Sequence, residues 1–395
     1  MSVLNSSLYW SLPSAIEFEE KIRNAALRHR VITLSFPEFM CVSPNKTIAK
    51  ALSNAGIHEP IVLNIPDGMN ISAEIGTHFN ASTMPADSLA HHSYGSAQAV
   101  VLHAKGVKAQ ENCEKYTAEF LRGMNKSVGD IRLIMTLRNG IHQVDQFDGD
   151  QAVIVFDGWI NSSEMQAYVY QRMVSYDGPG STTLYKNLVA EYASFDASLA
   201  ERLARMEPSS LLNLPDSLSQ IVSEDLLRWS RHGWVHGTTC KSSIEAHSLH
   251  EWYLVTHSPK QAEKNRKLSE KRYWRACVKS LMPWLEERRL LIIDILKRPI
   301  DEIEATSGVK NKIEKKLGDR YVHVSRDELE YNDLVYRSYG EEFRELNLTS
   351  TENAAVSICH KAKKVRDDLS HLRRPEIEYI KNLIFEMDQL VSLNK

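Results

Sequence analysis

Short apolar runs alternate with amphipathic stretches along the first part of the chain. Each run is almost continuously apolar, which is typical of strands that are buried on both faces. The helical stretches KTIAKALSNAG and ENCEKYTAEFLRGM separate some of these runs. The pattern therefore predicts an α/β domain with a parallel sheet over residues 1–160. The five predicted strands are VITLSF (31–36), PIVLNI (60–65), AVVLHA (99–104), IRLIMTL (131–137) and AVIVFDG (152–158).

The pattern is mainly helical after residue 160, so we expect two further domains that are mostly α-helical. Residues 161–297 are predicted to form a helical lid, in which RWSRHGWVHGTTC (228–240) has the aromatic and glycine content of a winged-helix-like hairpin. Residues 298–395 are predicted to form a separate helical bundle. In that bundle, apolar residues at three- and four-residue spacing predict two amphipathic helices that flank a charged corner. The apolar positions of these helices are Ala355, Ile358, Ala362, Val365, Leu369 and Leu372, followed by Ile377, Ile380, Ile384 and Leu390.

Composition narrows the classes of protein that need to be considered. The net charge of the 395 residues is only -3, which excludes the surface-wide positive field of a constitutive nucleic-acid binder. The five cysteines are far apart and odd in number, which favours reduced thiols over a disulfide scaffold. No apolar run approaches the roughly 20 residues that span a bilayer. We therefore expect a cytoplasmic protein without a membrane partner.

The segment between the first strand and the following helix reads VITLSFPEFMCVSPNKTIAKAL. A phosphate-binding loop needs G-x-x-x-x-G-K-[ST] at this place, because glycines let backbone amides wrap the phosphates and lysine neutralises them. Lys46 and Thr47 match the last two positions, whereas Met40 and Asn45 stand where the glycines belong. The alternative is that KTIAKAL is only an amphipathic helix with a polar start.

This segment resembles the P-loop of the AAA+ and STAND-type NTPases in a degenerate form. The resemblance implies a P-loop NTPase-like parallel sheet, with Asn45, Lys46 and Thr47 as a degenerate nucleotide-binding site. His103 and Lys105 stand where an acidic strand end would bind magnesium. We therefore expect no hydrolysis of nucleotide and no required cofactor, although a nucleotide that is bound and not hydrolysed is compatible with Lys46 and Thr47.

The charged corner reads VRDDLSHLRRP, and Arg366 and His371 within it are five residues apart. That spacing corresponds to about 140° around a helix, so an i,i+4 stabilising pair does not explain it, and both side chains could face one groove. The motif R-[ND]-x-x-x-H before a final helix resembles the HEPN superfamily of helical bundles. The resemblance implies a metal-independent ribonuclease site in which Arg366 stabilises the developing charge, His371 is the acid or base, and Asp367 is the polar second position. The alternative is a solvated helix end.

Basic residues surround this motif and would hold an RNA backbone. Asp367 and Asp368 add negative charge beside them. The predicted phosphate-binding residues are Lys361, Lys363, Lys364, Arg373 and Arg374.

A group of histidines in the middle region is a candidate zinc site. It lacks a second ligand pair of recognised spacing, so we predict no metal site there. The group comprises His232, His236, His247, His250 and His257, with Cys240 and Glu251 nearby.

The combined architecture is similar to bacterial conflict and antiphage systems, in which nucleotide-dependent modules regulate toxic RNA cleavage. The resemblance implies an effector or regulatory subunit that assembles with itself or with a larger protein partner of the same system, and that cuts RNA if it is active. Two other classes stay open. One is a non-catalytic scaffold or adaptor with a pseudo-NTPase domain, and the other is a DNA-binding regulator that uses the middle region.

Overall fold

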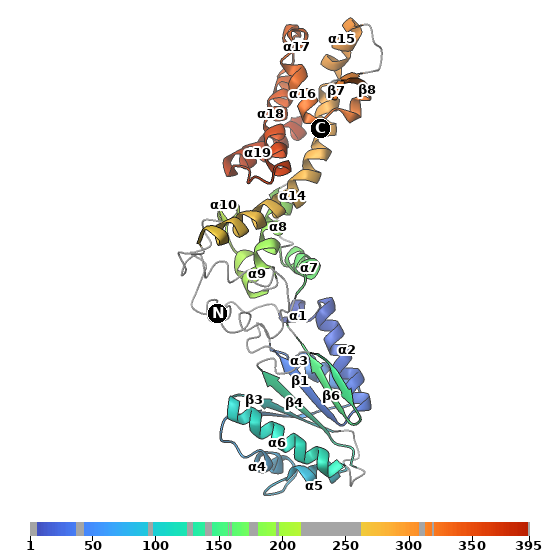
Figure 1. Ribbon diagram of the computed structural model, residues 1–395, viewed down its shortest axis with the longest axis vertical. Helices are drawn as coiled ribbons and strands as arrows, with labels where there is room; N and C mark the ends of the chain where they lie inside the picture. Colours follow the sequence, from blue (N-terminus) through green and yellow to red (C-terminus); the bar gives the residue numbers. More distant parts are fainter. Residues whose placement is uncertain are drawn as a thin grey trace. The chain divides into compact units, whose positions relative to one another are not determined.

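The computed structural model describes residues 6–36, 43–93, 98–124, 129–138, 144–156, 158, 160–173, 181–194, 197–214, 262–307, 313–317 and 320–393 (Figure 1). These residues divide into two compact units. Unit 1 contains the described residues up to Tyr168 and those of Ala193–Arg202. Unit 2 contains the described residues of Val169–Tyr192, Leu203–Ile221 and Leu254–Lys395. The hairpin predicted at 228–240 lies outside the described residues, and the division into three domains stays a prediction.

Unit 1 is built on a six-stranded sheet with the order β2-β3-β4-β1-β6-β5. All pairings are parallel except that of β5 with β6. The five strands predicted from the apolar runs are confirmed, with small shifts at their ends, whereas the short exposed strand β5 was not predicted. The strands are β1 (Val31–Phe36), β2 (Ile61–Ile65), β3 (Ala99–Ala104), β4 (Arg132–Arg138), β5 (Gln146–Asp148) and β6 (Gln151–Val155).

Helices cover both faces of this sheet (Figure 1). Every residue of β1 and β3 is buried, which explains why these two runs are mostly apolar. Phe18 of α2 packs against Phe36 and Phe156 on one face, with ring centroids 5.5 and 4.6 Å apart. The described helices of unit 1 are α1 (Ser6–Tyr9), α2 (Pro13–Arg28), α3 (Asn45–Asn54), α4 (Ile71–His78), α5 (Ala86–His91) and α6 (Val107–Met124), with most of α7 (Ser162–Arg172) and of α9 (Ala197–Leu203).

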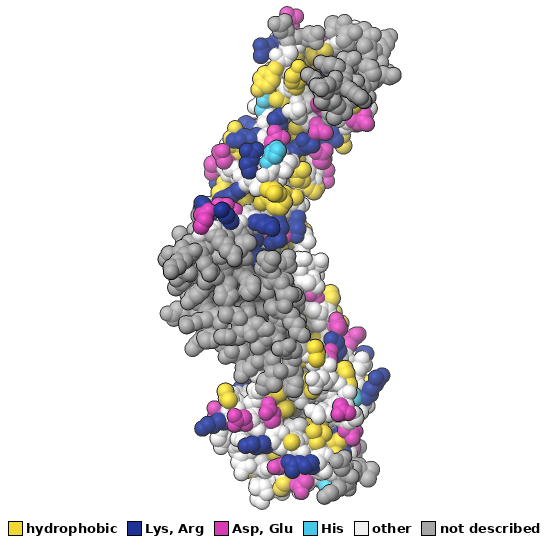
Figure 2. All heavy atoms as spheres, in the orientation of Figure 1, with side chains coloured by type: hydrophobic (Ala, Val, Ile, Leu, Met, Phe, Trp, Pro, Cys, Tyr) yellow, Lys and Arg dark blue, Asp and Glu magenta, His cyan; other side chains and the backbone are white. Residues whose placement is uncertain are grey.

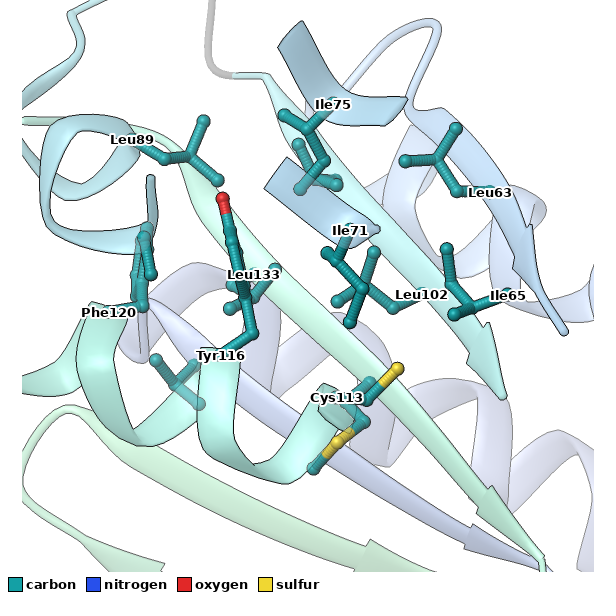
Figure 3. Close-up of a cluster of buried hydrophobic side chains, with 14 of the residues drawn as sticks. Leu63, Ile65, Ile71, Ile75, Leu89, Leu102, Cys113, Tyr116, Phe120 and Leu133 are labelled. Carbon is teal, nitrogen blue, oxygen red and sulfur yellow. The ribbon is translucent and has the colours of Figure 1, made fainter. Parts of the chain in front are cut away.

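The core on the opposite face joins strands β1 to β4 to helices α4, α5 and α6 (Figure 3). Phe120 and Cys113 of α6 are fully buried in it, beside Leu102 of β3. The hydroxyl of Tyr116 donates to the carbonyl of Met84 at 2.8 Å, so its polar end is satisfied inside the core. Burial of each large side chain of this kind contributes roughly 1.5–3 kcal/mol.

The described part of unit 2 is mainly helical. Helix α18 packs against α14, α16 and α19, and the two amphipathic helices predicted near the C-terminus are confirmed as α18 and α19. A two-stranded hairpin, β7 with β8, lies in a charged run for which no strands were predicted. The described elements of unit 2 are α8 (Ser181–Ala193), α10 (Pro208–Leu212), α14 (Ala262–Ile295), α15 (Lys297–Ser307), β7 (Ile313–Leu317), β8 (Arg320–Val324), η5 (Arg326–Glu328), α16 (Tyr331–Ser338), α17 (Glu341–Glu345), α18 (Ser350–Ser370) and α19 (Ile377–Leu393).

Both ends of α18 are fixed by local hydrogen bonds. At the start, the hydroxyl of Thr349 accepts from the backbone N–H of Glu352 at 3.2 Å, and Glu352 also accepts two bonds from Arg298 at 3.0 and 2.6 Å. The Arg298 guanidinium lowers the pKa of the Glu352 carboxyl. At the end, the N–H of Arg373 donates to the carbonyl of Asp368 at 2.8 Å, which closes a Schellman motif.

Leu372 occupies the left-handed position of that motif, with φ at 57°. Glycine is favoured at this position because a Cβ atom is strained there. Leu372 was predicted to continue the apolar face of α18, and that prediction is wrong, because the helix ends at Ser370 and the leucine side chain is 72% exposed.

Candidate functional site

Two polar side chains meet near the carboxyl edge of the sheet in unit 1. His103 of β3 and Thr136 of β4 are register partners, and both are buried. Nδ1 of His103 lies 2.9 Å from Oγ1 of Thr136. The Thr136 hydroxyl donates to the carbonyl of Leu102 at 3.4 Å, so the histidine proton belongs on Nδ1.

His103 is 5% exposed, and its environment disfavours the charged imidazolium. Burial lowers its pKa from 6.5 to about 4, and the nearby positive charges of Lys105 and Arg138 add to that effect. The imidazole is therefore neutral at pH 7. Magnesium prefers oxygen ligands, and a neutral imidazole is a poor substitute for a carboxylate at this place.

Asn45, Lys46 and Thr47 form the first turn of α3, immediately after Pro44. Asn45 and Lys46 are exposed, whereas Thr47 is buried. The N–H of Asn45 donates to Oγ of Ser43 at 3.4 Å. Met40, the other position at which a glycine was expected, lies outside the described residues.

Asp67 follows β2 at the same edge of the sheet and was missed in the sequence. Its Oδ1 accepts from the N–H of Ala109 at 2.7 Å, so it caps the first turn of α6. A Cβ atom on Gly106 would lie only 2.4 Å from that oxygen, so glycine is required for this close approach. The carboxylate is therefore already engaged by the helix. The sequence signal that could have identified Asp67 is its position two residues after the end of β2.

In unit 2, the two members of the predicted catalytic pair lie at the C-terminal end of α18 and have different surroundings. Nη2 of Arg366 lies 3.0 Å from a carboxylate oxygen of Glu330, and its Nε lies 4.0 Å from Glu286 of α14. Its side chain is 26% exposed. His371 is the exposed C-cap residue, and no hydrogen bond between it and Arg366 is present in this described region. Arg366 thus faces the packed side of α18, whereas His371 lies at the open end.

The predicted phosphate-binding residues carry internal partners. Asp367 accepts from Lys363 at 2.7 Å, and Asp368 pairs with Arg373 at 3.3 Å. These two aspartates therefore neutralise their basic neighbours. The other contacts are Lys361 with Glu386, Lys364 with Glu376 at 3.2 Å and over the ring of Tyr379 at 3.8 Å, and Arg374 over the ring of Tyr273 at 4.7 Å.

The surface of this unit reflects that pairing. In Figure 2, dark blue and magenta side chains are interleaved over the region of α18 and α19 shown in Figure 1. The fields of neighbouring charges of opposite sign partly cancel, so a distant phosphate experiences a weaker field. On this face, the corner presents alternating charges and not one continuous basic patch.

The corner is also attached to α14. The indole N–H of Trp274 donates to the carbonyl of Leu369 at 2.8 Å, and the Arg374 guanidinium covers the neighbouring Tyr273 ring. Beyond the corner, an open groove of about 600 Å³ follows the start of α19. It is lined by Ser209, Asn213, Arg374, Pro375, Glu376, Ile377, Glu378 and Lys381.

The histidines considered for zinc lie outside the described residues. Within the described ranges, no group of three or more histidine, cysteine, aspartate or glutamate side chains could hold a metal ion. A search of the same residues found no helix with the length and apolar character needed to cross a membrane.

No protein-family model matches the sequence, and no curated protein matches it either.

Proposed function

We propose that the chain is a regulatory or scaffold subunit whose first unit has a P-loop NTPase-like fold without the ability to hydrolyse nucleotide. The observation that carries the proposal is the buried, neutral His103 hydrogen-bonded to Thr136. A magnesium-dependent phosphoryl transfer needs anionic oxygen ligands beside the metal. The His103–Thr136 pair offers a neutral imidazole and a hydroxyl that is already bonded.

The topology supports a ligand at this edge. Strand β1 lies between β4 and β6 in the sheet, and α3 is the next described helix along the chain. Ligands of open parallel sheets bind outside the carboxyl ends of the strands. Lys46, exposed in the first turn of α3, would attract a phosphate group. The unit would therefore sense a nucleotide without consuming it, as a regulatory subunit of a bacterial conflict or antiphage system assembled with itself or a larger partner.

The test measures binding and hydrolysis of ATP separately. Isothermal titration of the full chain with ATP, with and without magnesium, is compared between the wild type and Lys46→Ala. We expect hydrolysis no higher than that of Lys46→Ala, and any binding heat to be independent of magnesium. Magnesium-dependent hydrolysis by the wild type that Lys46→Ala abolishes would refute the proposal.

A metal-independent endoribonuclease is the second candidate function. It is favoured by the exposed His371 at the C-terminal end of α18, close in sequence to Arg373 and Arg374. An imidazole in solvent contact can exchange protons with the 2′-hydroxyl of RNA. The test compares cleavage of a labelled RNA, in buffer containing a metal chelator, by the wild type and by His371→Ala. Equal cleavage by the two proteins excludes this site.

A further inference from the structure

The basic residues at the α18 corner are matched by nearly as many carboxylates. Four of the five residues predicted to bind RNA phosphate, together with Arg366, have an acidic partner in the same unit. The five pairs are Lys361 with Glu386, Lys363 with Asp367, Lys364 with Glu376, Arg366 with Glu330, and Arg373 with Asp368. A protein gains most of its affinity for RNA by replacing counterions on phosphates with its own cations. Cations that are already paired contribute little to that exchange.

Glu330 is the principal partner of Arg366. The Glu286 carboxylate lies 4.0 Å from Nε of Arg366 but only 2.8 Å from Nε of Arg289, so its main partner is Arg289. Glu330 lies 3.0 Å from Arg366 and is itself 46% exposed. A guanidinium donates to a carboxylate and to a phosphate through the same N–H groups. The Glu330 carboxylate therefore occupies a place that an RNA phosphate would need.

Glu330 is carried by a short connection between η5 and α16. Arg289 donates to the carbonyls of Asp327 and Leu329 at 2.6 and 2.7 Å and so holds that connection against α14. Glu330 is also the N-cap residue of α16, where its side chain accepts a backbone bond and Asp333 accepts from its N–H at 2.9 Å. The position of the carboxylate is thus fixed by the fold and not by the ion pair alone.

We propose that Glu330 is an autoinhibitory carboxylate, which holds Arg366 and keeps single-stranded RNA off the α18 corner. This inference rests on the second candidate function, in which RNA is the substrate of this corner. An internal competitor acts at a high effective concentration, since it is tethered beside its target. It would keep basal RNA binding weak.

The experiment measures binding of a fluorescein-labelled single-stranded RNA of mixed sequence to the full chain, by fluorescence anisotropy. Glu330→Gln removes the charge but keeps an oxygen that can cap α16. The matched control is Glu378→Gln, which removes a carboxylate from Lys381 in the same unit, at 2.9 Å, with the same change in net charge. A half-exposed ion pair is a modest barrier, so we expect Glu330→Gln to bind about two- to fivefold more tightly and the control to bind like the wild type.

Two further readouts decide the assignment. Adding Arg366→Ala to Glu330→Gln should cancel the gain, and the salt dependence of binding should steepen by about one phosphate contact in Glu330→Gln. The proposal is overturned if Glu330→Gln and Glu378→Gln bind equally, or if neither binds at about 100 μM protein, the weak limit of non-specific binding. Self-association of Glu330→Gln without RNA binding would assign the corner to a protein partner and overturn it as well. Tighter RNA binding by Glu330→Gln without RNA cleavage would refute the proposed nuclease activity but would support the autoinhibitory role of Glu330.

Discussion

Replacing His103 by asparagine tests whether a buried neutral imidazole stands at the carboxyl edge of the sheet. The folded pKa is about 4, against 6.5 for a free imidazole, and burial is the main cause. Below pH 6.5 the unfolded chain takes up a proton that the folded chain refuses until about pH 4. Stability therefore falls as the pH is lowered through this window. At about 1.4 kcal/mol for each pKa unit, the total loss is about 3 kcal/mol.

His103→Asn keeps a side-chain N–H for Thr136 but has no proton to gain. At pH 7.5 we expect the variant to unfold about 1–2 kcal/mol more easily, because the smaller side chain leaves a cavity. As the pH falls to 4.5 the difference should shrink or reverse. Urea unfolding followed by circular dichroism measures this, with hydrogen exchange in β3 to identify the transition that belongs to unit 1.

Thr136→Val is the control for that experiment. It removes the hydrogen bond at 2.9 Å but leaves His103 buried, so it should lower stability by about 1 kcal/mol and retain the pH dependence. If the wild type and His103→Asn lost stability in parallel between pH 7.5 and 4.5, the imidazole would not be buried and neutral. The argument against a magnesium site would then lose its main support.

Three further experiments test the end of α18, the Asp67 cap and the buried thiols. Leu372→Gly should stabilise unit 2 by about 1 kcal/mol in thermal unfolding, because it relieves the left-handed strain, whereas Leu372→Ala keeps the Cβ atom and should stay close to the wild type; equal stability of the two variants contradicts the strain. Gly106→Ala should cost about 1 kcal/mol by displacing the Asp67 cap, and adding Asp67→Ala should cost little more; simple additivity would show that the two residues are independent. Three buried thiols have pKa values raised to about 12 by burial and should resist a thiol reagent at pH 8 until urea unfolds the chain, and rapid labelling of the native protein would refute their burial. They are Cys113, Cys277 and Cys359.

The strands of unit 1 could be predicted because burial on both faces leaves a direct record in the sequence. Residues of β1 and β3 are all buried, and their runs are mostly apolar. The hydrogen bond between His103 and Thr136 could not be predicted in the same way, since it depends on β3 lying next to β4 in register. The strand order that sets this pairing is a property of the connections and not of either run. The exposed strand β5 leaves no apolar signal at all.

The C-terminal corner shows a different limit. Helical spacing located both helices and the turn between them, because one apolar stripe per helix is enough to define a packed face. It also assigned Leu372 to that stripe, since periodicity alone does not mark the residue at which a helix stops. Glycine usually marks the left-handed position of a Schellman motif, but here Leu372 occupies it. The sequence therefore gives no signal for the end of α18.

The charges at that corner could not be assessed from neighbours in sequence alone. Asp367 and Asp368 are visible within the motif, but Glu286 comes from α14 and Glu330 from the connection before α16. The sequence around Arg366 therefore overstates the positive field, because carboxylates that are distant in sequence come close to Arg366 only in the folded chain. Arg366 shows that a residue can match a motif and still be engaged in an ion pair, so that it is not free to bind a ligand. Whether Arg366 can be released from Glu330 is then the feature that decides between an RNA-binding corner and a purely structural one.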